Sequence, residues 1–167
     1  TEIYPLSLHD VFRSISSRVK PLVHKHVIIR AEVLNPPTNE NTASNQIQTL
    51  IDRIGMKVLM GPFAKYVEMK GNRGLTVAAI IETSHIVLHA WDETDPALIQ
   101  LDVYTCGAFD PRTVFEWVEE YYNPVKMEYK YLDREHALTP ALLPEKDKFK
   151  FSTQELVDAT NAILQSS

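Results

Sequence analysis

The sequence predicts an α+β fold, a two-layer sandwich in which one mainly antiparallel sheet is covered by helices. Two observations predict it. Segments with strand-like patterns outnumber those with helical spacing, and the predicted order is helix, strand, helix, a run of strands, helix, strand, helix. We expect residues 1–167 to form a single domain, because a chain of 167 residues can bury a sizeable core without disulfides or metals.

The first part of the chain is predicted to contain two helices with a strand between them. A capping sequence followed by apolar residues at helical spacing predicts an N-terminal helix at about 7–20. Residues 26–34 alternate loosely and predict a strand. The apolar residues of 47–54 mark one helical face, and Gly55 is the residue type that closes a helix in the left-handed conformation.

The middle of the chain is rich in β-branched residues and predicts a run of strands. The predicted strands are residues 56–60, 75–82, 85–90 and 97–104. The polar segment 67–74, which contains two glycines, predicts a loop that leads into the second of these strands.

The last third of the chain begins with a strong helix signal. Asp110 can cap the free amides of a helix, and Pro111 is tolerated at its first position. A strand is predicted over 125–132 after this helix. Residues from about 136 to 167 form a predicted C-terminal extension, irregular at first and then helical from Ser152, where the capping-box pattern recurs.

Composition narrows the classes of function. The net charge of -5 and the lack of a basic run argue against a nucleic-acid partner. The apolar stretches are too short to span a bilayer, and the chain shows no signal-peptide pattern. A single cysteine excludes an internal disulfide framework and suits a reducing compartment. We therefore expect a soluble, cytoplasmic protein that does not bind a membrane.

Reactive side chains gather on the neighbouring segments 82–93 and 104–107. His85 and His89 are four residues apart, a zinc spacing on a helix, but their apolar neighbours favour a strand, on which they lie too far apart to chelate easily. We therefore expect no metal site. A hydrolase triad is disfavoured, because no Gly-x-Ser-x-Gly elbow surrounds Ser84. Cys106, the only thiol, could be a reactive group or simply an inert residue of the core.

Ser84 fits a different chemistry. A serine in a strained turn can attack the carbonyl of the preceding residue and convert the amide into an ester. Removal of the serine Cα proton then eliminates the ester, and the dehydroalanine that remains hydrolyses to a pyruvoyl group. Such a group is an electron sink made from the protein itself.

Several spaced motifs together resemble one family. They are Ser84-His85-Ile86, His89-x-Trp91-x-Glu93, the segment Asp102 to Gly107, and Asp110-Pro111. This pattern resembles the bacterial short form of S-adenosylmethionine decarboxylase, a pyruvoyl enzyme. The resemblance implies self-cleavage between Thr83 and Ser84, decarboxylation of S-adenosylmethionine for spermidine and polyamine biosynthesis through a Schiff base, and a homodimer.

The resemblance also implies a role for each matching residue. Ser84 resembles the serine that becomes the pyruvoyl cofactor, and His89 the histidine that takes the Cα proton during self-cleavage. Thr76 stands where the family has a serine hydroxyl that assists processing. Cys106 resembles the acid that returns a proton to the substrate carbon, since a thiol is ordinarily protonated at neutral pH. Glu93 resembles the carboxylate that binds the ribose hydroxyls.

The chain departs from the family pattern around these motifs. Thr83 replaces the glutamate before the cleaved serine, and Asp92 replaces the proline after the tryptophan. The loop 68–74 lacks the family's aromatic-proline-glycine pattern, which leaves Phe63 and Tyr66 as candidates for stacking on adenine.

These departures keep two alternatives open. The altered loop suggests a pyruvoyl decarboxylase of another amino acid, ornithine or arginine. Thr83 suggests an uncleaved, non-catalytic homologue that binds a ligand or a partner.

Overall fold

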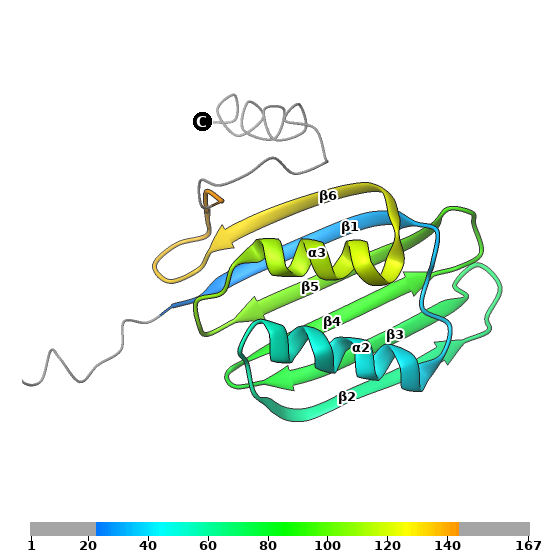
Figure 1. Cartoon of the computed structure of the whole chain (residues 1–167), viewed down its shortest axis with the longest axis horizontal. Helices are drawn as coiled ribbons and strands as arrows, with labels where there is room; N and C mark the ends of the chain where they lie inside the picture. The colour runs from blue at the N-terminus through cyan, green and yellow to red at the C-terminus, as the bar shows by residue number, and fades with distance from the viewer. Residues whose placement is uncertain (1–22, 144–167) are drawn as a thin grey trace, which may run out of the picture.

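The computed structural model describes residues 23–143 (Figure 1). The elements in chain order are β1 (Lys25–Val33), α2 (Glu40–Arg53), β2 (Val58–Val67), β3 (Gly74–Ile81), β4 (Ser84–Trp91), β5 (Ala97–Thr105), α3 (Pro111–Tyr122), β6 (Pro124–Asp133) and β7 (Thr139–Pro140). The helices predicted at about 7–20 and from Ser152 lie outside the described residues.

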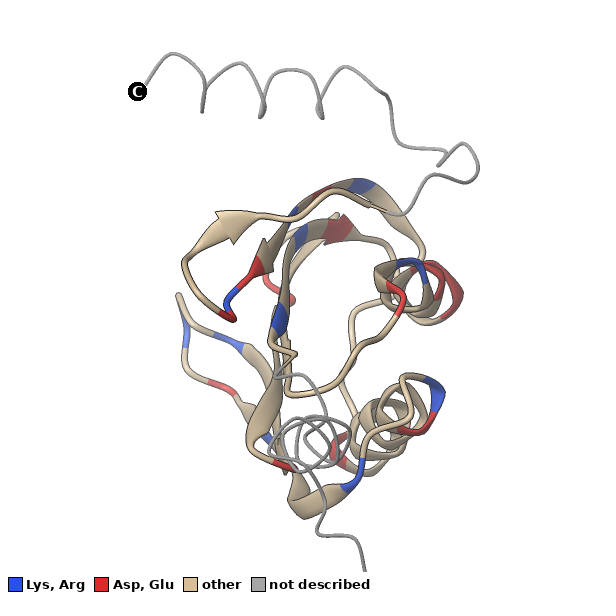
Figure 2. Cartoon of the chain, turned by 90° about the vertical axis from the view of Figure 1, so that its left-hand side faces the viewer, with Lys and Arg blue, Asp and Glu red and all other residues tan. Residues whose placement is uncertain are grey.

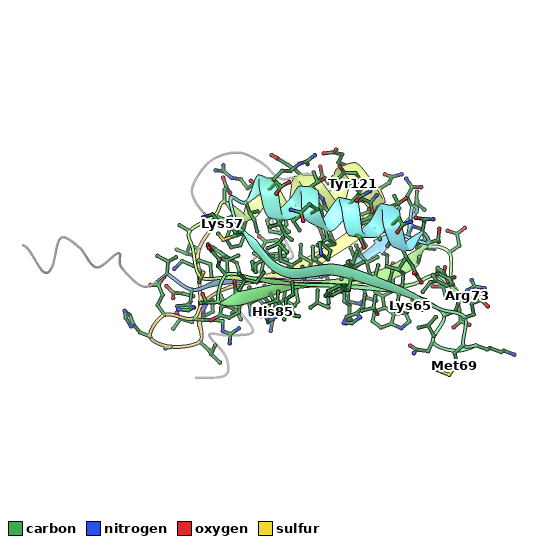
Figure 3. All side chains as sticks on the ribbon, turned by 90° about the horizontal axis from the view of Figure 1, so that it is seen from below. Lys57, Lys65, Met69, Arg73, His85 and Tyr121 are labelled. Carbon is green, nitrogen blue, oxygen red and sulfur yellow. The ribbon has the colours of Figure 1, made fainter. Side chains whose placement is uncertain are left out.

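The strands of the described segment form one seven-stranded sheet in the order β2-β3-β4-β5-β1-β6-β7, and all neighbours are antiparallel. Helices α2 and α3 lie on the same side of the sheet, which Figure 1 shows from the helix side and Figure 3 along the sheet. We call this side the helix face and the other the open face. The predicted α+β sandwich is confirmed.

The core lies between the sheet and the two helices, and β4 shows how the sequence divides its residues between faces. Ile86, Leu88 and Ala90 are buried on the helix face, while His85 and His89 are only partly buried on the open face. The label of His85 in Figure 3 stands on the side of the sheet away from the helices. The two histidines therefore share one face of a strand, as the alternation predicts.

Both helices begin and end with the capping residues that the sequence offers. The Asn39 side chain accepts a hydrogen bond from the Thr42 amide at 2.9 Å, and the chain turns after α2 at Gly55 with a φ of 71°. Asp110 accepts from the Arg112 amide at 3.0 Å before α3, with Pro111 in the first turn. The two N-terminal caps satisfy amides that have no partner within the helix.

The charged residues of the two helices lie on their outer sides, away from the sheet (Figure 2). Arg53 of α2 and Glu120 of α3 join the helices there, with nitrogen–oxygen distances of 2.6 Å and 3.0 Å. Phe115 and Trp117 of α3 are buried, and the Trp117 indole donates a hydrogen bond to the Gln46 carbonyl oxygen of α2 at 3.0 Å. This helix layer lies on the side of the sheet opposite to the open-face histidines.

Three element boundaries differ from the prediction. Helix α2 starts at Glu40, earlier than predicted, because its first turns are polar apart from the buried Ala43 and show little apolar periodicity. Strand β2 continues to Val67 although Gly61-Pro62 interrupts its pattern, since the register shifts at that point and pairing with β3 resumes at Phe63. The segment expected to be irregular contains the short strand β7.

Candidate active site

The turn between β3 and β4 brings the predicted nucleophile and the only thiol to one backbone carbonyl. Ser84 Oγ donates a hydrogen bond to the carbonyl oxygen of Glu82 at 3.1 Å, and Cys106 Sγ donates to the same oxygen at 2.7 Å. Ser84 is buried, with 9% of its surface exposed, while Cys106 is partly exposed. We call Glu82, Thr83, Ser84 and Cys106 the cleavage end of the site.

Thr83 has an unusual backbone conformation in this turn. Its φ is 55°, in the left-handed region that glycine and asparagine adopt more readily than a β-branched residue. A non-glycine residue held in this region costs about 1–3 kcal/mol. The peptide bond that self-cleavage would break therefore follows a strained residue and precedes the Ser84 hydroxyl.

The loop that carries Cys106 is fixed by its neighbours. Thr105 is fully buried and donates a hydrogen bond from Oγ1 to the Gly107 carbonyl oxygen at 2.8 Å. A Cβ atom at Gly107 would lie 2.9 Å from the Met56 methyl carbon, so glycine lets this loop pack closely. The thiol is thus presented at the sheet rim by a packed turn.

Thr76 and His89 form a second pair, on the open face. They are opposite each other in the β3–β4 register, and Thr76 Oγ1 and His89 Nδ1 lie 2.9 Å apart. The His89 ring lies 5.9 Å from the Trp91 ring, between centroids. The predicted hydroxyl and base therefore contact each other, and Trp91 lies beside them.

Glu93 lies just beyond β4, next to the loop of residues 68–73. Its Oε1 accepts a hydrogen bond from the Gly71 amide at 2.9 Å. The Trp91 indole donates to Asn72 Oδ1 at 2.9 Å, from the same stretch of chain. We call Trp91 to Glu93, together with this loop, the binding end of the site. Phe63, a candidate for stacking on adenine, is 66% exposed on β2.

The described chain does not bring these two groups together. His89 follows Ser84 by five residues along β4, a separation of about 16 Å at the usual strand rise. The two side chains also alternate to opposite faces. The sequence suggested one cluster around Ser84, whereas a single chain has Ser84 and Cys106 at one place and Thr76, His89 and Glu93 at another.

The structure reveals a polar network beside the cleavage end that the sequence reasoning missed. Asp102 is hydrogen-bonded to His26 Nε2, and its Oδ1 lies 3.7 Å from His85 Nε2. The hydrogen bond from His26 lowers the pKa of Asp102 below its ordinary value, although burial opposes this. The Arg134 guanidinium lies over the Tyr104 ring, 4.1 Å from its centroid. The signal in the sequence was the alternation that places Asp102 and Tyr104 on the open face.

The open face also contains a hollow of about 420 Å³, whose lining includes His85, His89, Gln100 and Asp102. No three His, Cys, Asp or Glu residues within 23–143 gather as they would around a metal ion. In the same range, no helix is long and apolar enough to cross a membrane.

Comparisons with known proteins identify the family of the chain. The family model described as S-adenosylmethionine decarboxylase matches residues 25–135. The S-adenosylmethionine decarboxylase proenzyme of Pyrobaculum arsenaticum is 45% identical over 64 residues, which are 38% of this chain and 50% of that protein. The proenzyme of Pyrobaculum islandicum is 44% identical over the same shares. The chain thus spans about half the length of these curated relatives.

A solved structure supports the fold. The adenosylmethionine decarboxylase from Aquifex aeolicus superposes with a TM-score of 0.51 at 17% identity, covering 78% of this chain and 100% of that one. The match to the family model extends over all of the strands that carry the two ends of the site. This chain therefore belongs to the S-adenosylmethionine decarboxylase family.

Proposed function

We propose that this protein is a pyruvoyl-dependent decarboxylase of S-adenosylmethionine, which acts in polyamine and spermidine biosynthesis. It would make its cofactor by cleaving itself between Thr83 and Ser84. The observation that carries the proposal is the cleavage end, where a buried hydroxyl and the only thiol share the Glu82 carbonyl next to a strained residue. Family membership supports the same activity.

Self-cleavage would use only groups of the chain and water. Ser84 Oγ attacks the carbonyl carbon of Thr83, and the amide between them becomes an ester with a free amine on residue 84. A base takes the Cα proton of residue 84, the ester bond breaks, and Thr83 leaves as a new carboxylate end. Water then replaces the nitrogen as ammonia and leaves the ketone. Strain at Thr83 favours the first step because the conversion releases it.

The surrounding residues fit the cofactor. A pyruvoyl group formed from Ser84 would act as an electron sink when the substrate loses carbon dioxide. The Cys106 thiol, which lies beside Ser84, would donate a proton to the substrate carbon. Glu93 would accept hydrogen bonds from the ribose hydroxyls through Oε2, since Oε1 already accepts from Gly71. Thr76 would orient His89 through their 2.9 Å contact.

The separation of Ser84 from His89 supports a homodimer as the working unit. A two-fold axis perpendicular to the strands, between two open faces, would bring the rim of the sheet that carries the cleavage end of one copy next to the binding end of the other. Each of two sites would then combine Ser84 and Cys106 of one copy with Thr76, His89 and Glu93 of its partner.

The open face offers apolar surface for such packing. Ile28, Phe63 and Ile80 are 36%, 66% and 49% exposed there. Contact between copies would remove these side chains from water, which favours association by about 25 cal/mol per Å² of apolar area.

A denaturing gel of the purified protein tests the proposal. We expect two fragments divided at residue 84, and carbon dioxide release from S-adenosylmethionine. Ser84→Ala is the matched control and should remain one band, because it lacks only the attacking oxygen. A full-length band in both samples would instead favour the uncleaved homologue that binds a ligand or partner. Release from ornithine or arginine alone would favour the alternative substrates.

Two further expectations stay predictions. Residues 1–167 are expected to form one domain, with the N-terminal helix and C-terminal extension belonging to it. The reaction is expected to take place in the cytoplasm, which fractionation of cells followed by detection of the chain would test.

A further inference from the structure

The loop of residues 68–73 is attached residue by residue to the end of β4. The Gly71 amide donates to Glu93, and the Trp91 indole donates to Asn72, each at 2.9 Å. The Asp92 amide donates to the Arg73 carbonyl oxygen at 3.3 Å. Residues before β3 and residues at the end of β4 therefore stay in contact beyond the paired strands, through hydrogen bonds that involve side chains and backbone.

Asp92 is the centre of these contacts. Its Oδ1 accepts from Arg73 Nε at 2.7 Å, and its Oδ2 accepts from the Tyr66 hydroxyl at 2.6 Å. Arg73 also donates from Nη2 to the Asp92 carbonyl oxygen at 2.7 Å. The Asp92 side chain is only 9% exposed. Charge-assisted bonds of this kind are stronger than neutral ones and fix orientation.

The charges agree with this geometry. Burial opposes ionisation of Asp92, but the hydrogen bonds from Tyr66 and Arg73 outweigh it and keep the pKa of Asp92 below its ordinary value. The hydrogen bond to Asp92 raises the pKa of Tyr66, so the tyrosine remains a donor. Tyr66 is held in turn by α2, because its amide donates to Glu40 Oε1 at 2.9 Å.

We propose that Asp92, clasped by Arg73 and Tyr66, is a positioning residue that fixes Glu93 for recognition of the substrate's ribose. This inference rests on the proposed function, in which Glu93 accepts from the ribose hydroxyls. The clasp fixes the peptide directly before Glu93, and the Gly71 amide fixes one of its two carboxylate oxygens. The other oxygen is then held in one direction and remains available to the ligand.

The conformation of Gly71 supports a role that involves Glu93 and not merely loop closure. Gly71 has a φ of 84°, and a Cβ atom there would meet nothing within 4 Å. Lack of space therefore does not explain the glycine at this position. The left-handed backbone conformation that turns its amide toward Glu93 does explain it, because glycine adopts this conformation readily. The loop directs a backbone donor onto the carboxylate.

The test compares S-adenosylmethionine with its 2′-deoxy analogue on the self-cleaved enzyme. In Asp92→Asn and in Arg73→Gln we expect KM for S-adenosylmethionine to rise about tenfold with kcat within about twofold, the loss that follows a broken charged hydrogen bond. The preference for the ribose over the deoxyribose compound should fall toward that of Glu93→Gln. The double variant should be no worse than either single one, because the partners act as a unit.

The control is Arg53→Gln, which breaks the ion pair between α2 and α3 on the far side of the sheet. We expect its KM and its ribose preference to match the wild type. Self-cleavage should proceed at the wild-type rate in every variant, because the clasp holds Glu93, which takes no part in that reaction. A wild-type ribose preference in Asp92→Asn, or a loss confined to kcat, would overturn the proposal.

Failure of the proposed function is visible separately, in the wild type alone. If the wild-type chain releases no carbon dioxide, the decarboxylase assignment fails. Equilibrium dialysis with adenosine and 2′-deoxyadenosine then tests separately whether the clasp positions Glu93 for a ribose. Tighter binding of adenosine that Asp92→Asn abolishes and Arg53→Gln retains would support the clasp. Equal binding of the two nucleosides by the wild type would reject it.

Discussion

The two ends of β4 differ in the interactions that hold their side chains. At the cleavage end, Ser84 and Cys106 converge on one backbone carbonyl beside the strained Thr83, without an ion pair among them. At the binding end, an aspartate, an arginine and a tyrosine form three hydrogen bonds shorter than 3 Å, and the Gly71 amide forms a fourth to Glu93. Figure 3 shows His85 toward one end of the sheet and Arg73 and Met69 at the other.

The difference indicates how one hairpin can serve two purposes. A bond that must break is best placed where the backbone is under strain, whereas a group that must recognise a ligand is best placed where it cannot move. Within one chain, the length of β4 keeps the strained turn away from the residues proposed to recognise the ligand.

The largest effect is expected from pairing two inactive variants. Ser84→Ala removes the hydroxyl of the cleavage end and His89→Ala removes the proposed base on the open face, so each alone should lack activity. Co-expressed, they should recover about a quarter of wild-type activity, because half the dimers are mixed and each holds one intact site under two-fold symmetry. Carbon dioxide release from the co-purified mixture measures this. No recovery would mean that one chain supplies both ends.

Cys106→Ala separates the two reactions of the cleavage end. We expect decarboxylation to fall by about a hundredfold or more, the usual size of a lost general acid, while self-cleavage continues at a reduced rate. Carbon dioxide release and the appearance of fragments on a gel give the two rates. Cys106→Ser, which keeps a donor to the Glu82 carbonyl, should cleave faster than Cys106→Ala. Equal losses in both reactions would contradict separate roles.

Relief of strain at Thr83 should slow self-cleavage several-fold. In Thr83→Asn the left-handed conformation is tolerated, so the free energy of unfolding of the Ser84→Ala chain should rise by about 1 kcal/mol. Thr83→Val is the matched control, because it keeps the β-branch and loses only the hydroxyl. Denaturant unfolding and the fragment rate check both claims. A Thr83→Asn chain that cleaves as fast as the wild type would show that strain is not used.

The smallest effect is expected from the network beside the cleavage end. Because the pKa of Asp102 is lowered in the folded chain, its ionised form stabilises the fold above its unfolded pKa of about 3.9, and this contribution is lost as pH falls through the folded value. Asp102→Asn should therefore be less stable than wild type at pH 7, with the difference shrinking below pH 4. Urea unfolding at several pH values measures it. Glu116→Gln, an exposed change on α3, should show no such trend.

The sequence predicted most of the fold because its signals are local. Asp110-Pro111 defines the start of α3, and alternation in β4 assigns residues to faces. The early start of α2 at Glu40 was missed because its first turns carry mainly polar residues, which give no apolar pattern at helical spacing. The end of β2 was missed because the bulge at Gly61-Pro62 is stabilised by pairing with β3, a non-local contact.

The site was predicted in composition but not in arrangement. The family resemblance supplied Ser84, His89 and Cys106, yet the distance between Ser84 and His89 depends on strand rise and on which face each residue occupies. The partners of Asp102 come from β1 and β4, and its contact with His26 joins residues far apart in sequence. Such contacts follow from strand order, which short motifs do not encode.

One consequence follows from the division of β4 under the proposed dimer. If neither end completes a site within one chain, two newly made chains must meet before either can cleave itself. The rate of self-cleavage at low concentration is then second order in the concentration of the chain. Dilution below the dissociation constant of the dimer would abolish activity. A cell would then convert a rise in synthesis of this chain into a steeper rise in working catalyst at low expression. Decarboxylase activity would therefore depend on the concentration of the protein even without a small-molecule regulator.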